Sequence, residues 1–197
     1  MKKKIGHINL GPFEVTSDKL VISDPCYHLG TWCMGTLSNV EPGMWTAGIG
    51  VVDTGDFGKR IAYLSAFHQD SPDIRGLKVC PASFEVGVDS AQAGIFDFGH
   101  FQDESVIEDQ ELTDFGSRWF TFCCYQTLDS EHHAGLIPYG VVANSGFGDG
   151  VYSCNYYTEA GKADTPVCGV VIDFELVRME QVMRHLVDHH TKEGPRR

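Results

Sequence analysis

Apolar and polar positions alternate along much of this chain, a pattern that predicts β-strands. The alternation is clear over residues 5–10, and a short apolar run at 20–24 ends at an Asp-Pro step. Residues 44–53 and 60–68 predict a hairpin, because the connection TGDFGK carries two glycines and an aspartate. Further strands are expected at 79–89 (bent near Pro81), 134–145, 150–158 and 167–176, the last two as a hairpin, while 92–98 either extends its predecessor or opens a loop.

Two segments have helical spacing instead. Thr113 or Asp114 is expected to cap a helix that runs to about Leu128, with apolar positions at Phe115, Trp119, Phe122 and Cys123. Residues 178–190 predict a closing amphipathic helix within a C-terminal extension (177–197), and residues 191–197 predict a frayed tail. The pattern as a whole predicts one α+β domain over 1–197. It is expected to be mainly antiparallel β-sheet, as a sandwich or partly open barrel, with one internal helix.

Length, charge and cysteine content narrow the class of protein. A chain of 197 residues suits a single domain with a real core, and a formal net charge of −12 disfavours nucleic acid and anionic lipid as partners. No apolar run approaches the roughly 20 residues of a membrane span, and the basic start lacks the apolar core of a signal peptide. Seven cysteines in no evident framework indicate reduced thiols, so a cytoplasmic location is expected.

Residues 97–114 are strongly acidic and contain no lysine or arginine. The acidic positions are Asp97, Asp103, Glu104, Glu108, Asp109, Glu111 and Asp114. Such a run is typical of a solvated loop with a short helix, the interpretation we favour. The alternative is an acidic docking face for a basic protein.

The first of three polar clusters at strand ends is SDPCYHLG, where Asp24, Cys26 and His28 alternate. A Cys-His pair can form a thiolate nucleophile, and with Cys33 the three could ligate a metal, although the spacing has little zinc specificity. The simpler interpretation is an Asx-turn at Asp24 with Cys26 packed in the core.

The second cluster, VDSAQAGIFD, runs from an apolar strand straight into Asp89 and Ser90, with Gln92 close behind. A turn explains the first two residues, whereas a binding site would use the carboxylate of Asp89 and the amide of Gln92 as convergent polar groups.

The third cluster, ANSGFGDGVY, places glycines at every second position around Asp149: Gly146, Gly148 and Gly150. If the segment is extended, the glycines share one face of bare backbone, and Ser145 and Asp149 share the other. If it is a loop, successive N–H groups form an anion-binding concavity. A glycine-rich bend in which Asp149 accepts backbone hydrogen bonds explains the pattern equally well.

VISDPCY, VGVDSAQAGIFD and SGFGDGVY, in that order, resemble the family called domain of unknown function 4241, found in bacteria and their phages. The resemblance also takes in RIAYL, the Trp119–Cys123 segment and GVVIDF, and covers about residues 15–176. It implies a common fold and a cytosolic setting, and no established activity. The family pattern has glycine where this chain has Ala91, a small departure that weakens any claim that this loop needs positive φ there.

Two functional hypotheses follow. In the first, Asp24, Asp89 and Asp149 converge as the acidic centre of a small-molecule site, with a divalent cation such as Mg²⁺ supporting hydrolysis of a phosphorylated or nucleotide-like ligand. The remaining site residues are then Cys26 as the competing nucleophile, and Gln92, Ser145, Gly146, Gly148, Gly150 and His28 as ligand contacts. In the second, the protein is a non-enzymatic interaction protein, such as a toxin-immunity factor or phage inhibitor. It then docks a basic partner through its acidic surface.

His185 and His189 lie four residues apart in the closing helix. This spacing is compatible with a metal pair, but the helix dipole and the adjacent basic tail favour a solvated helix end.

Overall fold

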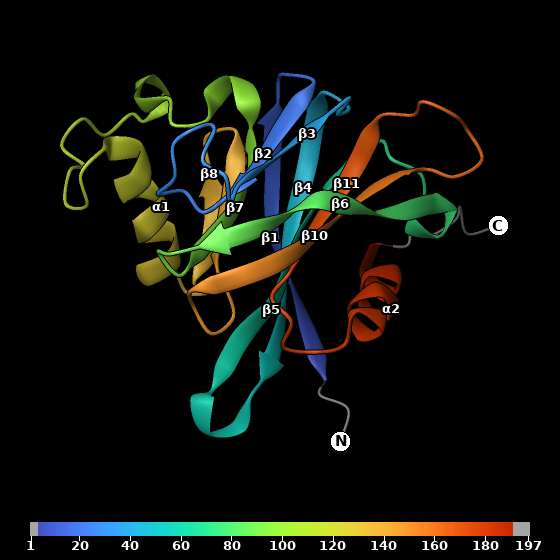
Figure 1. Cartoon of the computed structure of the whole chain (residues 1–197). Helices are drawn as coiled ribbons and strands as arrows, with labels where there is room; N and C mark the ends of the chain where they lie inside the picture. The colour runs from blue at the N-terminus through green and yellow to red at the C-terminus, as the bar shows by residue number, and fades with distance from the viewer. Residues whose placement is uncertain (1–3, 191–197) are drawn as a thin grey trace.

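The computed structural model describes residues 4–190. Its strands form two antiparallel sheets (Figure 1). The larger sheet contains, in spatial order, β1 (Ile5–Val15), β4 (Gly43–Asp53), β5 (Lys59–His68), β11 (Val167–Asp173), β10 (Gly150–Glu159) and β6 (Leu77–Val88). The smaller sheet contains β3 (Gly35–Ser38), β2 (Lys19–Ser23), β7 (Gln92–Asp97), β9 (Gly140–Asn144) and β8 (Ala134–Ile137). The expected α+β fold dominated by antiparallel sheet is confirmed, as a two-sheet sandwich.

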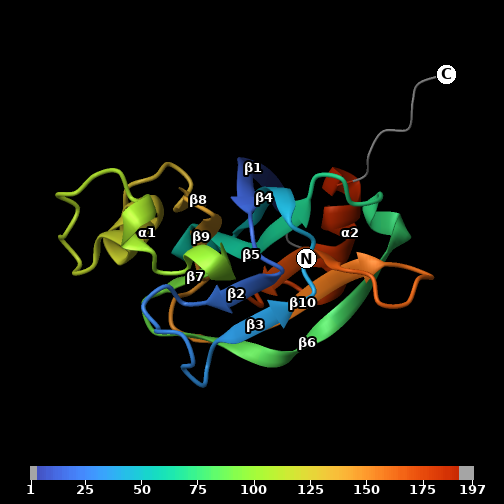
Figure 2. The ribbon, with the colours of Figure 1, turned by 90° about the horizontal axis from the view of Figure 1, so that it is seen from above.

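Two helices cover the outer faces of this sandwich, α1 (Arg118–Leu128) on the smaller sheet and α2 (Met179–His190) on the larger (Figure 2). Short 3₁₀ turns are η1 (Gly55–Phe57), η2 (Ile74–Gly76), η3 (Phe98–His100) and η4 (Glu104–Val106). The expected tail at 191–197 lies outside the described residues.

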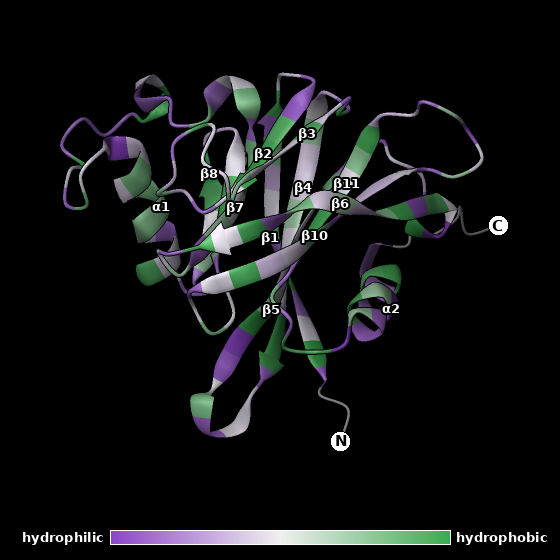
Figure 3. Cartoon of the chain, viewed as in Figure 1, coloured by the Kyte–Doolittle hydropathy of each residue, from purple (hydrophilic) through white to green (hydrophobic). Residues whose placement is uncertain are grey.

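The main core fills the space between the sheets. It contains Trp45 and Ile49 from the larger sheet and Ile22, Ile95 and Val141 from the smaller one. The smaller sheet is covered on both faces, which explains why every residue of β7 is buried. Hydrophobic positions are concentrated in the strands, whereas the long loop before α1 is mainly hydrophilic (Figure 3).

Helix α1 begins later than the sequence predicts. Its N-cap is Ser117, whose hydroxyl accepts a hydrogen bond from the Phe120 N–H at 3.2 Å, rather than Thr113 or Asp114. Gly116 has a φ of 104°, which breaks the helical path just before this cap. Phe115 therefore lies outside the helix and is 46% exposed, while Trp119 and Cys123 are buried against the smaller sheet as expected.

Two further differences concern the strands. The segment expected as one strand at 134–145 is two, β8 and β9, joined through Tyr139 with a φ of 60°. The four-residue strand β3 has no clear signal in the sequence.

Within residues 4–190, neither helix combines the length and apolar character that crossing a membrane requires.

Candidate functional site

The three polar motifs meet where the chain passes twice between the two sheets. Residues 89–91 lead from β6 into β7, and residues 145–149 lead from β9 back into β10. The two crossings are neighbours, because Gln92 pairs with Asn144 in one sheet and Gly150 pairs with Val88 in the other. We call this region the corner, defined as residues 23–26, 89–92 and 144–150.

Asp24 holds the first crossing in place. Its carboxylate has no solvent exposure and accepts hydrogen bonds from the N–H groups of Cys26 (2.8 Å), Asp89 (2.8 Å) and Ser90 (2.7 Å). The Ser90 hydroxyl adds a fourth at 2.6 Å. A chain that leaves one sheet for another exposes backbone N–H groups without ladder partners, and Asp24 satisfies those of the crossing at 89–90. The Asx-turn interpretation of Asp24 is thus confirmed.

The glycine-rich motif is a tight turn that closes on itself. The N–H groups of Gly146 and Gly148 donate to the carbonyls of Asn144 (3.2 Å) and Ser145 (2.8 Å), and the Ser145 hydroxyl donates to the Gly148 carbonyl at 2.8 Å. Gly146 has a φ of 60°, and a Cβ there would lie 3.1 Å from the Phe174 Cβ. The extended arrangement of this segment is therefore wrong. An anion-binding concavity would lack the N–H groups of Gly146 and Gly148, because both are used within the turn.

Asp149 links the two crossings from the outside. It is exposed, and its carboxylate accepts a hydrogen bond from the Ala91 N–H at 3.0 Å. Gly150 begins β10 as an ordinary ladder residue opposite Val88. The corner thus explains Ser145, Gly146, Gly148 and Asp149 as parts of the fold.

Gln92 is anchored to helix α1 instead of facing a ligand. The side chain is buried, its amide donates to the Cys124 Sγ at 3.4 Å, and its oxygen accepts from the Thr127 hydroxyl at 3.0 Å. These contacts dock α1 on the smaller sheet and leave the amide with no orientation toward a shared site.

Cys26 is placed unfavourably for a nucleophile. Burial and the neighbouring carboxylate of Asp24 raise the pKa of its thiol to about 12, so the thiolate is scarce at neutral pH. His28 hydrogen-bonds Gln102 through Nδ1 at 3.1 Å, out on an exposed loop. All seven cysteines of the chain, which lie within the described residues, are free thiols.

The metal hypothesis for Asp24, Asp89 and Asp149 finds no geometric support. Between residues 4 and 190, no group of three or more His, Cys, Asp or Glu side chains is arranged to hold a metal ion. Both oxygens of Asp24 already accept N–H groups. Asp89 instead lies by the Tyr27 hydroxyl. Burial is the main cause that raises the pKa of Tyr27, and the hydrogen bond with Asp89 is the next.

Position 91 carries backbone strain although its residue is not glycine. Ala91 has a φ of 56°, a left-handed conformation that costs a residue with a Cβ about 1 kcal/mol. The turn between β6 and β7 therefore does require positive φ.

Ala91→Gly is expected to stabilise the protein by about 0.5–1 kcal/mol, because glycine adopts this conformation without strain. Urea unfolding of the variant beside Ala93→Gly, a change in the buried centre of β7, measures the difference. Ala93→Gly is expected to destabilise, and a destabilised Ala91→Gly variant would contradict the strain.

The acidic segment divides into a buried end and an exposed end. Asp97 is fully buried and accepts hydrogen bonds from the backbone N–H groups and hydroxyls of Thr16 and Ser17. Burial alone would raise the pKa of Asp97, but these hydrogen bonds outweigh it and lower the pKa. Asp97 is therefore a structural clamp and no part of a docking face.

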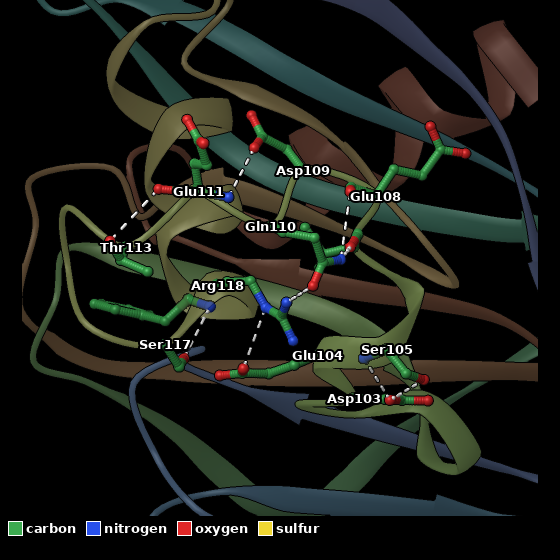
Figure 4. A network of polar contacts seen from close by, with 12 residues as sticks. Asp103, Glu104, Ser105, Glu108, Asp109, Gln110, Glu111, Thr113, Ser117 and Arg118 are labelled. Atoms are coloured by element: carbon green, nitrogen blue, oxygen red, sulfur yellow. Dashed lines mark hydrogen bonds and ion pairs between the residues drawn. The ribbon is translucent and has the colours of Figure 1, made fainter.

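The middle of the segment folds around one cation. Arg118 lies between Glu104, at 3.3 Å, and the side-chain oxygen of Gln110, while Asp103 caps η4 through the Ser105 N–H at 2.9 Å (Figure 4). Arg118 is directed into this network, so it leaves the outer carboxylates of the segment uncompensated.

One of these outer carboxylates, Asp114, contacts the ring of Tyr125 on the outer side of α1, and two others act on it through their charges. The Tyr125 hydroxyl donates to Asp114, and the Asp114, Asp129 and Asp109 charges all act to raise the pKa of Tyr125. Phe115 contacts Tyr125 edge to face, with ring centroids 6.4 Å apart. We call this surface the acidic patch, defined as Asp109, Asp114, Phe115, Tyr125 and Asp129. No strand-end motif marks it; its sequence signal is the acidic run together with an exposed aromatic before the helix cap.

No protein-family model, curated protein or solved structure matches this chain. The resemblance to the domain of unknown function 4241 family therefore stays a prediction. The function has to be inferred from the corner, the acidic patch and the cavities.

Proposed function

We propose that this protein is a non-enzymatic interaction protein that binds a basic protein through the acidic patch. The observation that carries the proposal is the hydrogen bond from the half-buried Tyr125 hydroxyl to Asp114, beside which the charges of Asp129 and Asp109 also act on Tyr125. Electrostatic complementarity of this kind sets partner choice and association rate.

The charge distribution supports the same surface. Residues 98–131 contain eight Asp or Glu and a single Arg or Lys, Arg118, which Glu104 and Gln110 already engage. This one loop and helix thus hold more than half of the net charge of −12. The field of the molecule is therefore concentrated at α1, where it can steer a basic partner.

Exposed apolar side chains give the patch a contact area beyond charge. Phe115 is 46% and Leu128 is 56% exposed beside the carboxylates. An arginine of the partner can stack on Phe115 or Tyr125 while it pairs with an aspartate, a combination that suits arginine better than lysine.

The corner supports a catalytic function much less. The carboxylate of Asp24 and the amide of Gln92 serve the fold, and the thiol of Cys26 is protonated at neutral pH. These contacts do not support metal-assisted hydrolysis at the corner.

Charge reversal of the patch is the test, with an eight-arginine peptide as a defined basic probe. Asp109→Lys/Asp114→Lys/Asp129→Lys is expected to weaken peptide binding at least tenfold in titration calorimetry at low salt. The matched control is Asp56→Lys/Asp70→Lys/Glu85→Lys, which reverses three exposed charges away from α1. Because both variants have the same net charge, attraction by the whole molecule falls equally.

The difference between the two variants is expected to shrink as salt rises, since exposed charges are screened over about 8–10 Å at 0.1–0.15 M. Equal weakening by both triple variants would reduce the patch to an undirected part of the overall charge and overturn the proposal.

A further inference from the structure

A cavity of about 580 Å³ differs from the acidic patch in its charge and in its lining. It is bounded by the N-terminal half of β1, the strand residues next to the turn of the β4–β5 hairpin and the loop between α1 and β8. The volume falls in the range of about 300–1,000 Å³ typical of sites for small organic ligands. None of the three aspartates of the corner lines it.

The rim of this cavity is basic within an acidic protein. Lys4, Lys59 and Arg60 line it, and none of them takes part in an ion pair described within residues 4–190. His132 and His133 add two imidazoles. Three cationic side chains at one rim stand out in a chain with a net charge of −12.

The acidic groups on the rim compensate this charge only in part. Glu131 and Asp53 also line the cavity. One oxygen of Asp53 accepts the Gly55 N–H at 2.8 Å, as part of the hairpin turn. Lys59 is the β-ladder partner of Asp53, yet the two side chains form no ion pair. The rim therefore keeps cationic groups available for an anion.

The floor of the cavity is apolar. Ile8, Val51 and Ile61 line it and belong to the side of the sheet that faces the main core. Ile61 is 5% exposed, and the other two are half-buried. A small inorganic anion gains nothing from such a floor, whereas an apolar group laid on it loses contact with water.

We propose that this cavity binds an amphipathic organic anion, with a phosphate or carboxylate head at the cationic rim and an apolar body on the floor. Arginine provides planar, paired donors that suit either head group, and lysine adds a point charge. The proposal goes beyond the docking function and is independent of it. None of the site residues proposed from the sequence lines this cavity, so it is a different site from the corner.

Nuclear magnetic resonance titration with three probes tests the cavity: adenosine monophosphate, decanoate and inorganic phosphate. At least one organic anion is expected to shift the amides of 4–8, 51–61 and 131–133 in a saturable way. Its affinity is expected to exceed that of inorganic phosphate at least tenfold, because only the organic anion contacts the floor. A preference between the two organic probes identifies whether the body is aromatic or aliphatic.

Lys59→Glu/Arg60→Glu is expected to weaken binding of the organic anion at least tenfold. Lys78→Glu/Lys162→Glu, which makes the same change in charge at exposed positions outside the cavity, is expected to leave it within about twofold. Both double variants lie on exposed strand or turn positions, and the amide spectrum reports directly whether each is folded.

Three results would each overturn the proposal. They are the absence of saturable shifts with both organic probes, equal affinity for inorganic phosphate, and equal weakening by the two double variants. The last result would assign the binding to overall charge and not to the cavity.

Discussion

Asp24→Asn is expected to destabilise the protein by about 3 kcal/mol, the largest effect of any single change at the corner. The carboxylate is fully buried and accepts four hydrogen bonds, three of them from backbone N–H groups. An asparagine places an NH₂ group where one of these donors needs an acceptor. At least one buried N–H then loses its partner, and the charge-assisted strength of the others falls. For a protein of this size the melting temperature drops by about 6–12 °C.

Asp149→Asn is the matched control, since it makes the same chemical change in the third motif. Asp149 is exposed and accepts one hydrogen bond, from Ala91, which the asparagine oxygen can still accept. The expected loss is below about 1 kcal/mol. Thermal unfolding of both variants by circular dichroism distinguishes the roles. Equal stability losses, or a larger loss at Asp149, would contradict a corner held together by Asp24.

Acidification from pH 6.5 to 4.5 is expected to destabilise the contact between α2 and β1. His7 stacks on His189 with ring centroids 4.9 Å apart and lies 5.3 Å from His190. Burial, followed by the charges of the neighbouring histidines, lowers the pKa of His7 and of His190 to about 4. The expectation of a solvated helix end at His185 and His189 is wrong for His185, which packs against His7 and Tyr63.

The direction of the pH effect follows from these values. Each histidine has a folded-state pKa below its unfolded value of about 6.5, so the unfolded chain binds more protons between pH 6.5 and 4. The stability from the neutral rings is present above pH 6.5 and is lost as the pH falls. Asp173 opposes this trend, because burial raises the pKa of its carboxyl to about 6. Protonation of Asp173 therefore stabilises the folded protein over part of the same pH range.

His7→Gln/His190→Gln isolates the histidine contribution, since Asp173 is unchanged in the variant. Both histidines retain some solvent exposure, so the wild-type protein is expected to lose only about 2 kcal/mol more than the variant between pH 6.5 and 4.5. This corresponds to roughly 4–8 °C in melting temperature. Urea unfolding of both proteins at four pH values measures the difference. Parallel pH profiles would show that the ring cluster does not titrate with folding.

The longer strands and the helices with one buried face follow from the sequence. The hairpin of β4 and β5 was predicted to within a residue at each end, because its alternation and its turn residues agree. The sequence does not predict strand β3, because only Gly35 and Leu37 of its four residues face inward and so short an alternation gives no clear pattern. The sequence does not identify Ser117 as the helix cap, because Thr113 and Asp114 are equally good capping residues. The position of the cap depends on the backbone conformation at Gly116.

The site was harder to predict than the fold. The three motifs lie side by side, because Asp24 and Asp149 accept hydrogen bonds from the backbone at Asp89, Ser90 and Ala91. The predicted convergence of the three carboxylates on one acidic centre has no such support. Their roles were not predictable, because a carboxylate that accepts N–H groups and one that binds a metal occur in the same sequence pattern. The acidic patch lies within residues 109–129, and the acidic run already marks it in the sequence. The basic cavity combines three segments distant in sequence, so no local pattern reveals it.

Binding and stability measured side by side on two variants provide the most direct test. The corner variant is Asp24→Asn, and the patch variant is Asp109→Lys/Asp114→Lys/Asp129→Lys. At 20 °C and low salt, the corner variant is expected to bind the eight-arginine peptide within about twofold of wild type, despite its lower melting temperature. The patch variant is expected to keep its melting temperature and to lose at least tenfold in affinity. Loss of peptide binding by the folded corner variant, with binding retained by the patch variant, would contradict the assignment of the corner to structure and the patch to recognition.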